Sequence, residues 1–265
     1  MFDAVPIVLQ RTRGTADVGF APDGRLSRLF QQGSAKAMLP RTHGDHPEVV
    51  FLNTAGGLTG GDRLSYSVTV APGTRVTATT QTAERAYASA GGVAEVAVTL
   101  EVGENARLDW LPQETILFDR AALHRTTRID LAPGATCLFA EMITLGRAAM
   151  GETVATLDLV DRRIVTRSGR PLMVEPLRLS GEDLARRDPA GLGTATALAT
   201  IALVGPGAED ALPALRRAFP GEAASAWDGR LVLRALSPDA HALRRRVAAL
   251  LEHLRGGPLP RVWQN

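Results

Sequence analysis

A glycine-rich stretch between two strand-like segments is the feature that most constrains the fold of this 265-residue chain. The apolar run at residues 49–52 leads into the sequence NTAGGLTGGD at residues 53–62, which places four glycines within six residues. Glycines at that density indicate a backbone that takes positive φ or approaches another segment closely. Apolar and polar residues then alternate strictly over residues 64–70 and, after a Pro-Gly turn, over residues 76–84. Alternation with a period of two predicts strands that bury one face.

The same plan of strand, glycine turn, strand and polar break occurs three times. The turns contain Gly73, Gly103 and Gly134, which are 30 and 31 residues apart. A nearly constant period of this length indicates stacked supersecondary units, each covering the apolar face of its neighbour. We therefore expect a mainly β fold, a β-helix-like solenoid stack of β-hairpin repeats, with a small C-terminal α part. Independent hairpins of a β-sandwich are the alternative.

The second strand of each unit ends in a carboxylate that is in phase with the apolar residues. These carboxylates are Glu84, Glu114 and Glu141. In stacked units, corresponding positions lie about 5 Å apart, and three adjacent carboxylates cannot all be ionised in an apolar interior without a cation, water or bound protons. The alternative is that a break in each strand resets the phase and turns each glutamate outward. Glu175, between Val174 and Pro176 in a later strand-like segment, is a further candidate for this acidic set.

The remaining patterns indicate one domain, mainly β over residues 1–205 and mixed over residues 206–265. Strands are predicted at residues 6–9, 35–39, 153–164, 171–179, 192–204 and 231–233, and a short helix over residues 208–219. A second helix is predicted to start with Ser237 as N-cap and Pro238 as its first residue, and to end at Gly256. The tail at residues 260–265 is either exposed or docked.

Composition argues against several classes of protein. The formal net charge is only +2 and no run of Lys and Arg exceeds three residues, so a nucleic-acid-binding surface is not expected. Cys137 is the only cysteine, which leaves no disulfide framework. The longest apolar run is shorter than the roughly 20 residues that a membrane-spanning helix needs. With no signal peptide visible, we expect a protein of the reducing cytoplasm.

The motifs of common active sites are missing or incomplete. His43 and His46 resemble a metal-binding pair, but two histidines around a glycine in a polar loop are more typical of a solvated turn. The glycine run lacks the Lys-Ser/Thr of a phosphate-binding loop, and neither G-x-S-x-G nor H-E-x-x-H occurs. His124 and His241 have no partner in a recognisable catalytic pattern. Paired carboxylates leave a β-helical carbohydrate-active enzyme as an alternative function, although aromatic residues make up only 5% of the chain.

Several segments together resemble one family. The run LNTAGGLTGGD at residues 52–62 closely resembles the signature of the urease accessory protein UreD, called UreH in some organisms. The resemblance extends to TTQTAERAY at residues 79–87, WLPQETI at residues 110–116, residues 139–152, the segment after Asp228 and the RVW ending at residues 261–263. It covers almost the whole chain, but His43 and His46 are not part of the pattern.

The resemblance implies a non-enzymatic maturation factor with no permanently bound cofactor. Such a protein forms a complex with UreF and with UreG, a GTPase that carries nickel, and docks on apo-urease to help load its nickel site. It also implies a passage through a β-helix-like fold, in which Ni²⁺ would be bound transiently. On that basis we expect oxygen ligands from Asp62, Glu84, Glu114, Glu141 and Glu175, because carboxylates hold a divalent cation without a closed thiolate and imidazole cage. The C-terminal helix and the tail with Arg261 are expected to face UreF.

Overall fold

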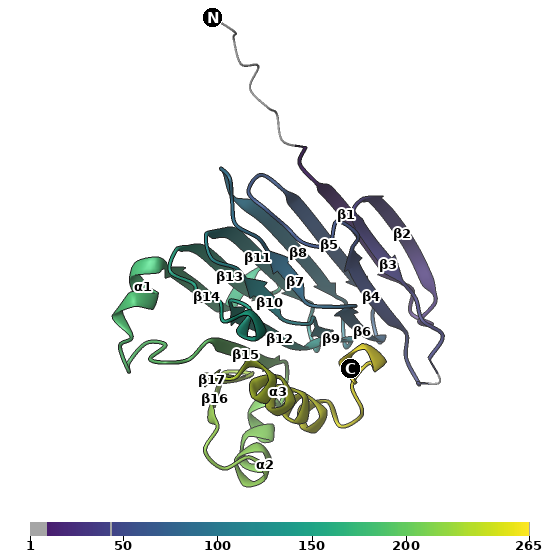
Figure 1. Cartoon of the computed structure of the whole chain (residues 1–265). Helices are drawn as coiled ribbons and strands as arrows, with labels where there is room; N and C mark the ends of the chain where they lie inside the picture. Colours follow the sequence, from purple (N-terminus) through teal and green to yellow (C-terminus); the bar gives the residue numbers. More distant parts are fainter. Residues whose placement is uncertain (1–9, 43, 265) are drawn as a thin grey trace, which may run out of the picture.

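The computed structural model describes residues 10–42 and 44–264, and these residues form two β-sheets that face each other (Figure 1). Sheet A has seven strands, in the spatial order β14 (Arg170–Ser180), β13 (Leu157–Arg167), β11 (Ala121–Leu131), β8 (Ala94–Val102), β5 (Arg63–Val70), β1 (Arg13–Phe20) and β2 (Leu26–Gly33). Sheet B has ten strands, and its main path is β16 (Ala223–Trp227), β17 (Arg230–Ser237), β15 (Ala197–Val204), β12 (Thr136–Leu145), β9 (Arg107–Leu111), β6 (Arg75–Thr80), β4 (Glu48–Asn53) and β3 (Ala35–Met38). The short strands β7 (Glu84–Ala86) and β10 (Thr115–Leu117) complete sheet B beside β12.

The chain winds between the two sheets as a solenoid, which confirms the predicted stack. Within sheet A, β1, β5, β8, β11 and β13 are all parallel, and β4, β6, β9 and β12 are parallel within sheet B. The two strands of each unit do not pair as a hairpin, however, because the glycine turn carries the chain from sheet A into sheet B. Hydrogen bonds therefore join equivalent strands of successive coils, and the apolar faces of the two sheets meet between them.

The pairing register corrects the predicted equivalence of the turns. Val70 lies beside Val102, and Val102 lies beside Leu131, so the successive coils contain 32 and 29 residues. The equivalent turn positions are Gly73, Asn105 and Gly134, whose φ angles of 69°, 55° and 72° are all left-handed. Glycine and asparagine tolerate this conformation best. The turn position in the second unit is therefore Asn105, and Gly103 is not equivalent to the other two glycines.

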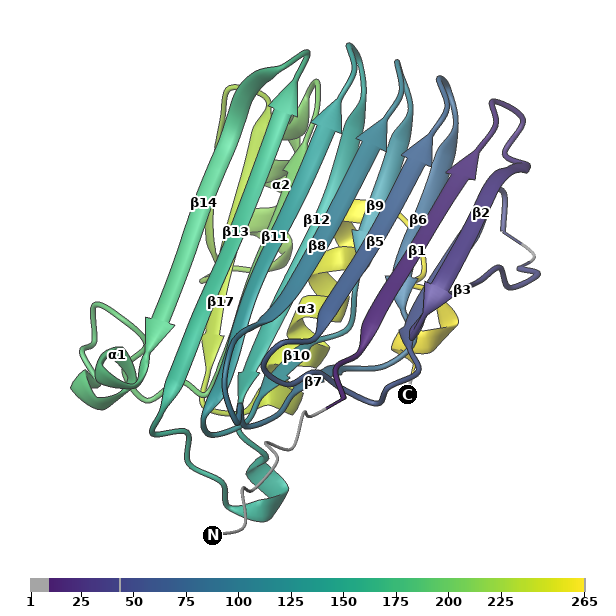
Figure 2. The same cartoon turned by 90° about the horizontal axis from the view of Figure 1, so that it is seen from above.

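The main hydrophobic core fills the space between the sheets, and a second core lies outside sheet B. Alternate residues of β12 divide between them: Phe139 and Ile143 pack into the first core, whereas Leu138 and Met142 pack into the second. The helices α2 (Ala211–Ala218) and α3 (Ala240–Arg255) cover the second core. In Figure 2 both helices lie behind the strands. The central strands β9, β12 and β15 of sheet B are therefore buried on both faces.

The C-terminal part confirms both predicted helices and moves the start of the longer one. Asp239, not Ser237, is the N-cap of α3, because its carboxylate accepts hydrogen bonds from the backbone N–H groups of His241 and Ala242. Ser237 is the last residue of β17. The predicted tail docks: Trp263 is buried and donates its indole N–H to the carbonyl oxygen of Leu111 at 3.0 Å.

The other predicted elements are mostly found with shifted ends. The strands expected at residues 35–39, 153–164, 171–179, 192–204 and 231–233 correspond to β3, β13, β14, β15 and β17. The strand expected at residues 6–9 lies outside the described residues. The helix predicted over residues 208–219 begins as the 3-10 turn Ala208–Asp210 and continues as α2. The sequence did not predict α1 (Gly181–Arg186) or the 3-10 turns Ala148–Met150 and Arg261–Trp263. Among the described residues, no helix combines the length and apolar character needed to cross a bilayer.

Candidate functional site

Two of the predicted acidic residues lie together in the interior of the solenoid. Glu84 on β7 and Glu141 on β12 line one cavity of about 50 Å³ between the sheets, and Tyr66, Thr115 and Arg125 also line it. A cavity of this size has room for water, since one water molecule needs roughly 10–15 Å³. The two carboxylates do not share a ladder position, because Glu84 pairs with Thr115 and Thr115 pairs with Ile143. The two side chains line the same cavity from different ladder positions, so they do not form the predicted column of stacked carboxylates.

Glu84 has few groups that can stabilise its charge. Its carboxylate accepts hydrogen bonds of 3.3 and 3.4 Å from Nδ2 of Asn53. Burial raises the pKa of Glu84 to about 7, although the hydrogen bond from Asn53 and the nearby Arg85 lower it. Near neutral pH this carboxyl group is therefore divided between its protonated and ionised forms. Glu84 also lines a second small cavity, together with Asn53 and Thr82.

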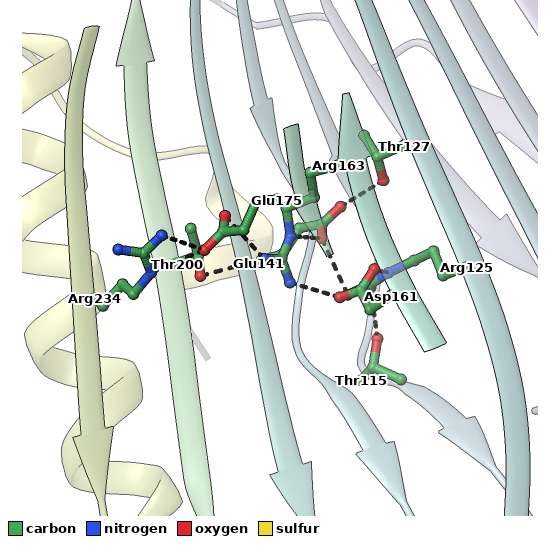
Figure 3. A network of polar contacts seen from close by, with 9 residues as sticks. All are labelled: Thr115, Arg125, Thr127, Glu141, Asp161, Arg163, Glu175, Thr200 and Arg234. Carbon is green, nitrogen blue, oxygen red and sulfur yellow. Dashed lines mark hydrogen bonds and ion pairs between the residues drawn. The ribbon is translucent and has the colours of Figure 1, made fainter. Parts of the chain in front are cut away.

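Glu141 lies instead in a dense network of ion pairs, which Figure 3 shows. Its Oε2 atom is 2.6 Å from Nε of Arg163 and 3.1 Å from Nη2 of Arg125, and its Oε1 atom accepts a hydrogen bond of 2.7 Å from the Thr127 hydroxyl. The side chain of Glu141 is only 1% exposed. The two guanidinium groups and the hydroxyl of Thr127 offset the cost of burying this carboxylate.

Asp161 on β13 joins the two arginines of this network. Its carboxylate accepts hydrogen bonds from Nε and Nη2 of Arg125 at 2.9 and 2.6 Å, and from Nη2 of Arg163 at 2.6 Å. Burial alone would raise the pKa of Asp161, but the charges and hydrogen bonds of Arg125 and Arg163 outweigh it and hold the pKa below its usual value. Both arginines remain charged, because the carboxylates more than offset the effect of burial on their pKa values.

Glu175 marks the far end of the network. It lies on the edge strand β14, where its carboxylate contacts Nη1 of Arg163 at 3.2 Å and Nη2 of Arg234 at 2.7 Å. These residues border a groove of about 580 Å³ between β14 and β17, with Thr200 at its base. A line of polar side chains therefore runs through the interior, from the cavity at Glu84 to this groove.

Glu114 does not belong to that line, so the predicted inward column of three glutamates is wrong at this position. Its carboxylate is 2.8 Å from Nη1 of Arg244 on α3, outside sheet B. The preceding Gln113 also faces outward, with its side-chain amide donating to the carbonyl oxygen of Val262, whereas the following Thr115 faces Arg125 in the interior. The irregular residues between β9 and β10 thus reset the alternation, which was the alternative interpretation.

Asp62 holds the glycine-rich loop in place. Its carboxylate accepts hydrogen bonds from the backbone N–H groups of Thr12 at 2.7 Å and Thr59 at 2.8 Å, and it is 4% exposed. The loop lies against the segment at residues 85–93, to which it is bridged at Leu58. A side chain at Gly60 would collide with that segment, which explains the need for glycine there. The position of Asp62 supports a role in the fold.

Of the histidine pair, His43 lies outside the described residues, and only the surroundings of His46 are described. His46 faces cations: its Nε2 atom is 3.1 Å from Nη2 of Arg255 and 3.0 Å from the hydroxyl of Thr77. Burial lowers the pKa of His46, and the charges of Arg75 and Arg255 lower it further. Within residues 10–42 and 44–264, no three His, Cys, Asp or Glu side chains form a group arranged to hold a metal ion.

The arginines of the interior were not predicted from the sequence, although its alternation contains a signal for them. Arg125 falls on the same face of β11 as Leu123 and Ile129, and Asp161 and Arg163 alternate in phase with the apolar residues of β13. Charged residues in phase with a buried face indicate a buried ion pair. The alternation that predicts an inward position for Glu141 thus also predicts inward positions for Arg125, Asp161 and Arg163.

The chain is similar throughout its length to proteins of one family. The family model described as "UreD urease accessory protein" matches residues 12–264. The urease accessory protein UreD of Cereibacter sphaeroides is 57% identical over 97% of this chain and 96% of its own length. The protein of the same name from Paracoccus denitrificans is 54% identical, over 100% and 96% of the two chains, and that from Jannaschia sp. is 51% identical over the full length of both. This chain belongs to the UreD family of urease accessory proteins.

Proposed function

We propose that this protein is a urease maturation factor that binds apo-urease together with UreF and UreG and assists nickel insertion. We further propose that nickel moves between the two sheets, past Glu84, Glu141 and Glu175. Family membership supports the role in urease maturation. The observation that supports the passage is that Glu84 and Glu141 line one cavity between the two sheets.

The chemistry of these side chains suits a transient cargo. Carboxylate oxygens bind Ni²⁺ less tightly than thiolates and imidazoles do, and conduction requires sites that release the ion. Glu84 offers two oxygens whose described hydrogen-bond donor is the amide of Asn53. A divalent ion that reaches this point displaces a proton from Glu84, since a ligand must be deprotonated to bind metal.

Asp62 and Glu114 are not part of the proposed passage. Asp62 is occupied by two backbone N–H groups of the glycine-rich loop region, and Glu114 pairs with Arg244 outside sheet B. The face of α3 that points away from sheet B remains our proposed contact with UreF. The docked tail contributes to that surface through Arg261, which is exposed.

The proposal is tested by urease activation in cells that carry the remaining urease genes and a Glu84→Gln variant of this chain. We expect lower urease activity and lower nickel content of the urease, with unchanged co-purification of UreF, UreG and apo-urease. Glu104→Gln, at an exposed turn position, is the matched control and should activate normally. A Glu84→Gln variant that loads nickel normally would refute the passage at this residue. Failure of the unaltered chain to co-purify with any urease component would refute the maturation role itself.

A further inference from the structure

Arg163 occupies the centre of the polar line, where carboxylates from three neighbouring strands converge on one guanidinium group (Figure 3). Its Nε atom is 2.6 Å from Glu141 on β12, its Nη2 atom is 2.6 Å from Asp161 on β13, and its Nη1 atom is 3.2 Å from Glu175 on β14. The hydroxyl of Thr200 lies 3.3 Å from Nη1. With 2% of its side chain exposed, Arg163 is the cation that these carboxylates already hold.

The network as a whole is electrically balanced. Its three arginines and three carboxylates are Arg125, Arg163, Arg234, Glu141, Asp161 and Glu175. A divalent cation that entered this arrangement would be repelled by two buried guanidinium groups at close range, and repulsion of this kind is strong where water is excluded. The carboxylates become available to a second cation only when an arginine leaves them.

Space for such a movement lies next to Arg163. The groove of about 580 Å³ between β14 and β17 is bordered by Arg163 itself, and it opens beside Glu175. Arg163 reaches Glu175 and Thr200 through Nη1, the atom nearest the groove residues. Arg125 borders instead the cavity of about 50 Å³ at Glu84, which has less than a tenth of the volume of the groove.

We propose that Arg163 is the gate of the nickel passage: its guanidinium fills the place of a cation among Glu141, Asp161 and Glu175, and a metal ion passes only when Arg163 turns into the groove beside β14. This inference rests on the proposed nickel passage and adds its regulation. In the closed state the interior carboxylates do not retain a divalent ion. The arginine thus prevents the passage from becoming a static metal trap.

The test is direct Ni²⁺ binding to the full-length chain, without a histidine tag and fused to a soluble carrier that does not bind nickel. Arg163→Met removes the charge while keeping an unbranched side chain, and it should raise the affinity for Ni²⁺ at least about tenfold by equilibrium dialysis. Arg162→Met is the matched control, because Arg162 is the neighbouring arginine of β13 and is exposed; its Ni²⁺ binding should equal that of the unaltered chain. Arg163→Lys, which keeps the charge, should also show no gain.

Two further measurements keep the result decisive. The double variant Arg163→Met/Glu141→Gln removes one charge of each sign, so it should bind Ni²⁺ no more tightly than the unaltered chain does. If the double variant gains as much Ni²⁺ affinity as Arg163→Met alone, the gate is overturned. If Arg163→Met does not fold without metal, Ni²⁺ but not Mg²⁺ should restore a cooperative thermal transition, and no recovery would overturn the gate. A folded Arg163→Met variant without extra Ni²⁺ binding would likewise overturn it. Activation by Glu84→Gln is measured separately, so the passage can fail or stand independently of the gate.

Discussion

Glu84→Gln should make the protein more stable at neutral pH, although Glu84 is a residue of the proposed passage. The side chain is largely buried, and its ionised form is disfavoured there, as its pKa of about 7 indicates. Glutamine has nearly the same shape and keeps an oxygen that accepts the hydrogen bond from Asn53. The substitution therefore removes the cost of a buried charge without creating a cavity.

The magnitude and its pH window follow from the two pKa values. A pKa raised from 4.5 to about 7 corresponds to at most about 3 kcal/mol against the ionised form in the folded state. Because the folded-state pKa is raised, the contribution of Glu84 to stability is fully present below pH 4.5 and is lost as the pH rises through 7. The variant should therefore equal the unaltered protein below pH 4.5 and exceed it by this amount at pH 8. For a chain of this size, that difference shifts Tm by about 6–12 °C at most.

Thermal unfolding of both proteins between pH 4.5 and pH 8 measures this effect. Titration of all other groups is common to the two chains, so the difference in Tm isolates Glu84. The Glu104→Gln control, at an exposed position, should show a constant difference near zero. Parallel curves for Glu84→Gln and the unaltered chain, or a variant that is less stable at pH 8, would refute the reasoning. A stabilised variant that also fails to activate urease would show that the loss of function is not a loss of fold.

The remaining predictions concern the ion-pair network and the tail. Asp161→Asn leaves Arg125 and Arg163 with one partner charge fewer in the interior. It should lower the free energy of unfolding by about 3–5 kcal/mol in urea titrations at pH 7. Because the pKa of Asp161 is lowered in the folded protein, this loss should become smaller as the pH falls below 4. Trp263→Ala should lower stability by about 3–5 kcal/mol and expose the C-terminal segment to proteases, because the indole is buried and stacks under Arg244. Trp227→Ala, at a side chain that is 43% exposed, should change stability by less than about 1 kcal/mol.

The parts of the fold that could be predicted from the sequence are those in which apolar and polar residues follow a regular period. The alternating segments identify the strands of each coil, and the inward position of Glu141 follows from its parity with Cys137 and Phe139. The helix α3 follows from apolar residues three and four apart, such as Leu243 and Val247. Each of these inferences depends on residues within one element, where geometry is fixed by the period.

The errors arose where two elements meet or where a period is interrupted. The turn of Glu114 to the outer face depends on the three irregular residues between β9 and β10, residues 112–114, and no period extends across them. Ser237 was the wrong N-cap because β17 continues through it, which is decided by pairing with Ala197. The sequence gives no indication of the buried Asp109, which pairs with Arg75, Arg107 and Arg255, because Arg255 lies 146 positions away along the chain.

The interior neutralises its carboxylates in two different ways, and the difference assigns them different roles. At Glu84 a proton neutralises the charge in part of the molecules near neutral pH, and in the passage that we propose a metal ion would displace that proton. At Glu141 the charge is balanced by Arg163, and in the proposed gate a metal ion would replace that charge only when the guanidinium moves. In the passage that we propose, the first arrangement would make the entry of the ion sensitive to pH, and the second would make its onward movement depend on a conformational step. An interior with ionised, unpaired acids at both positions would be less stable and would hold the ion too tightly to release it.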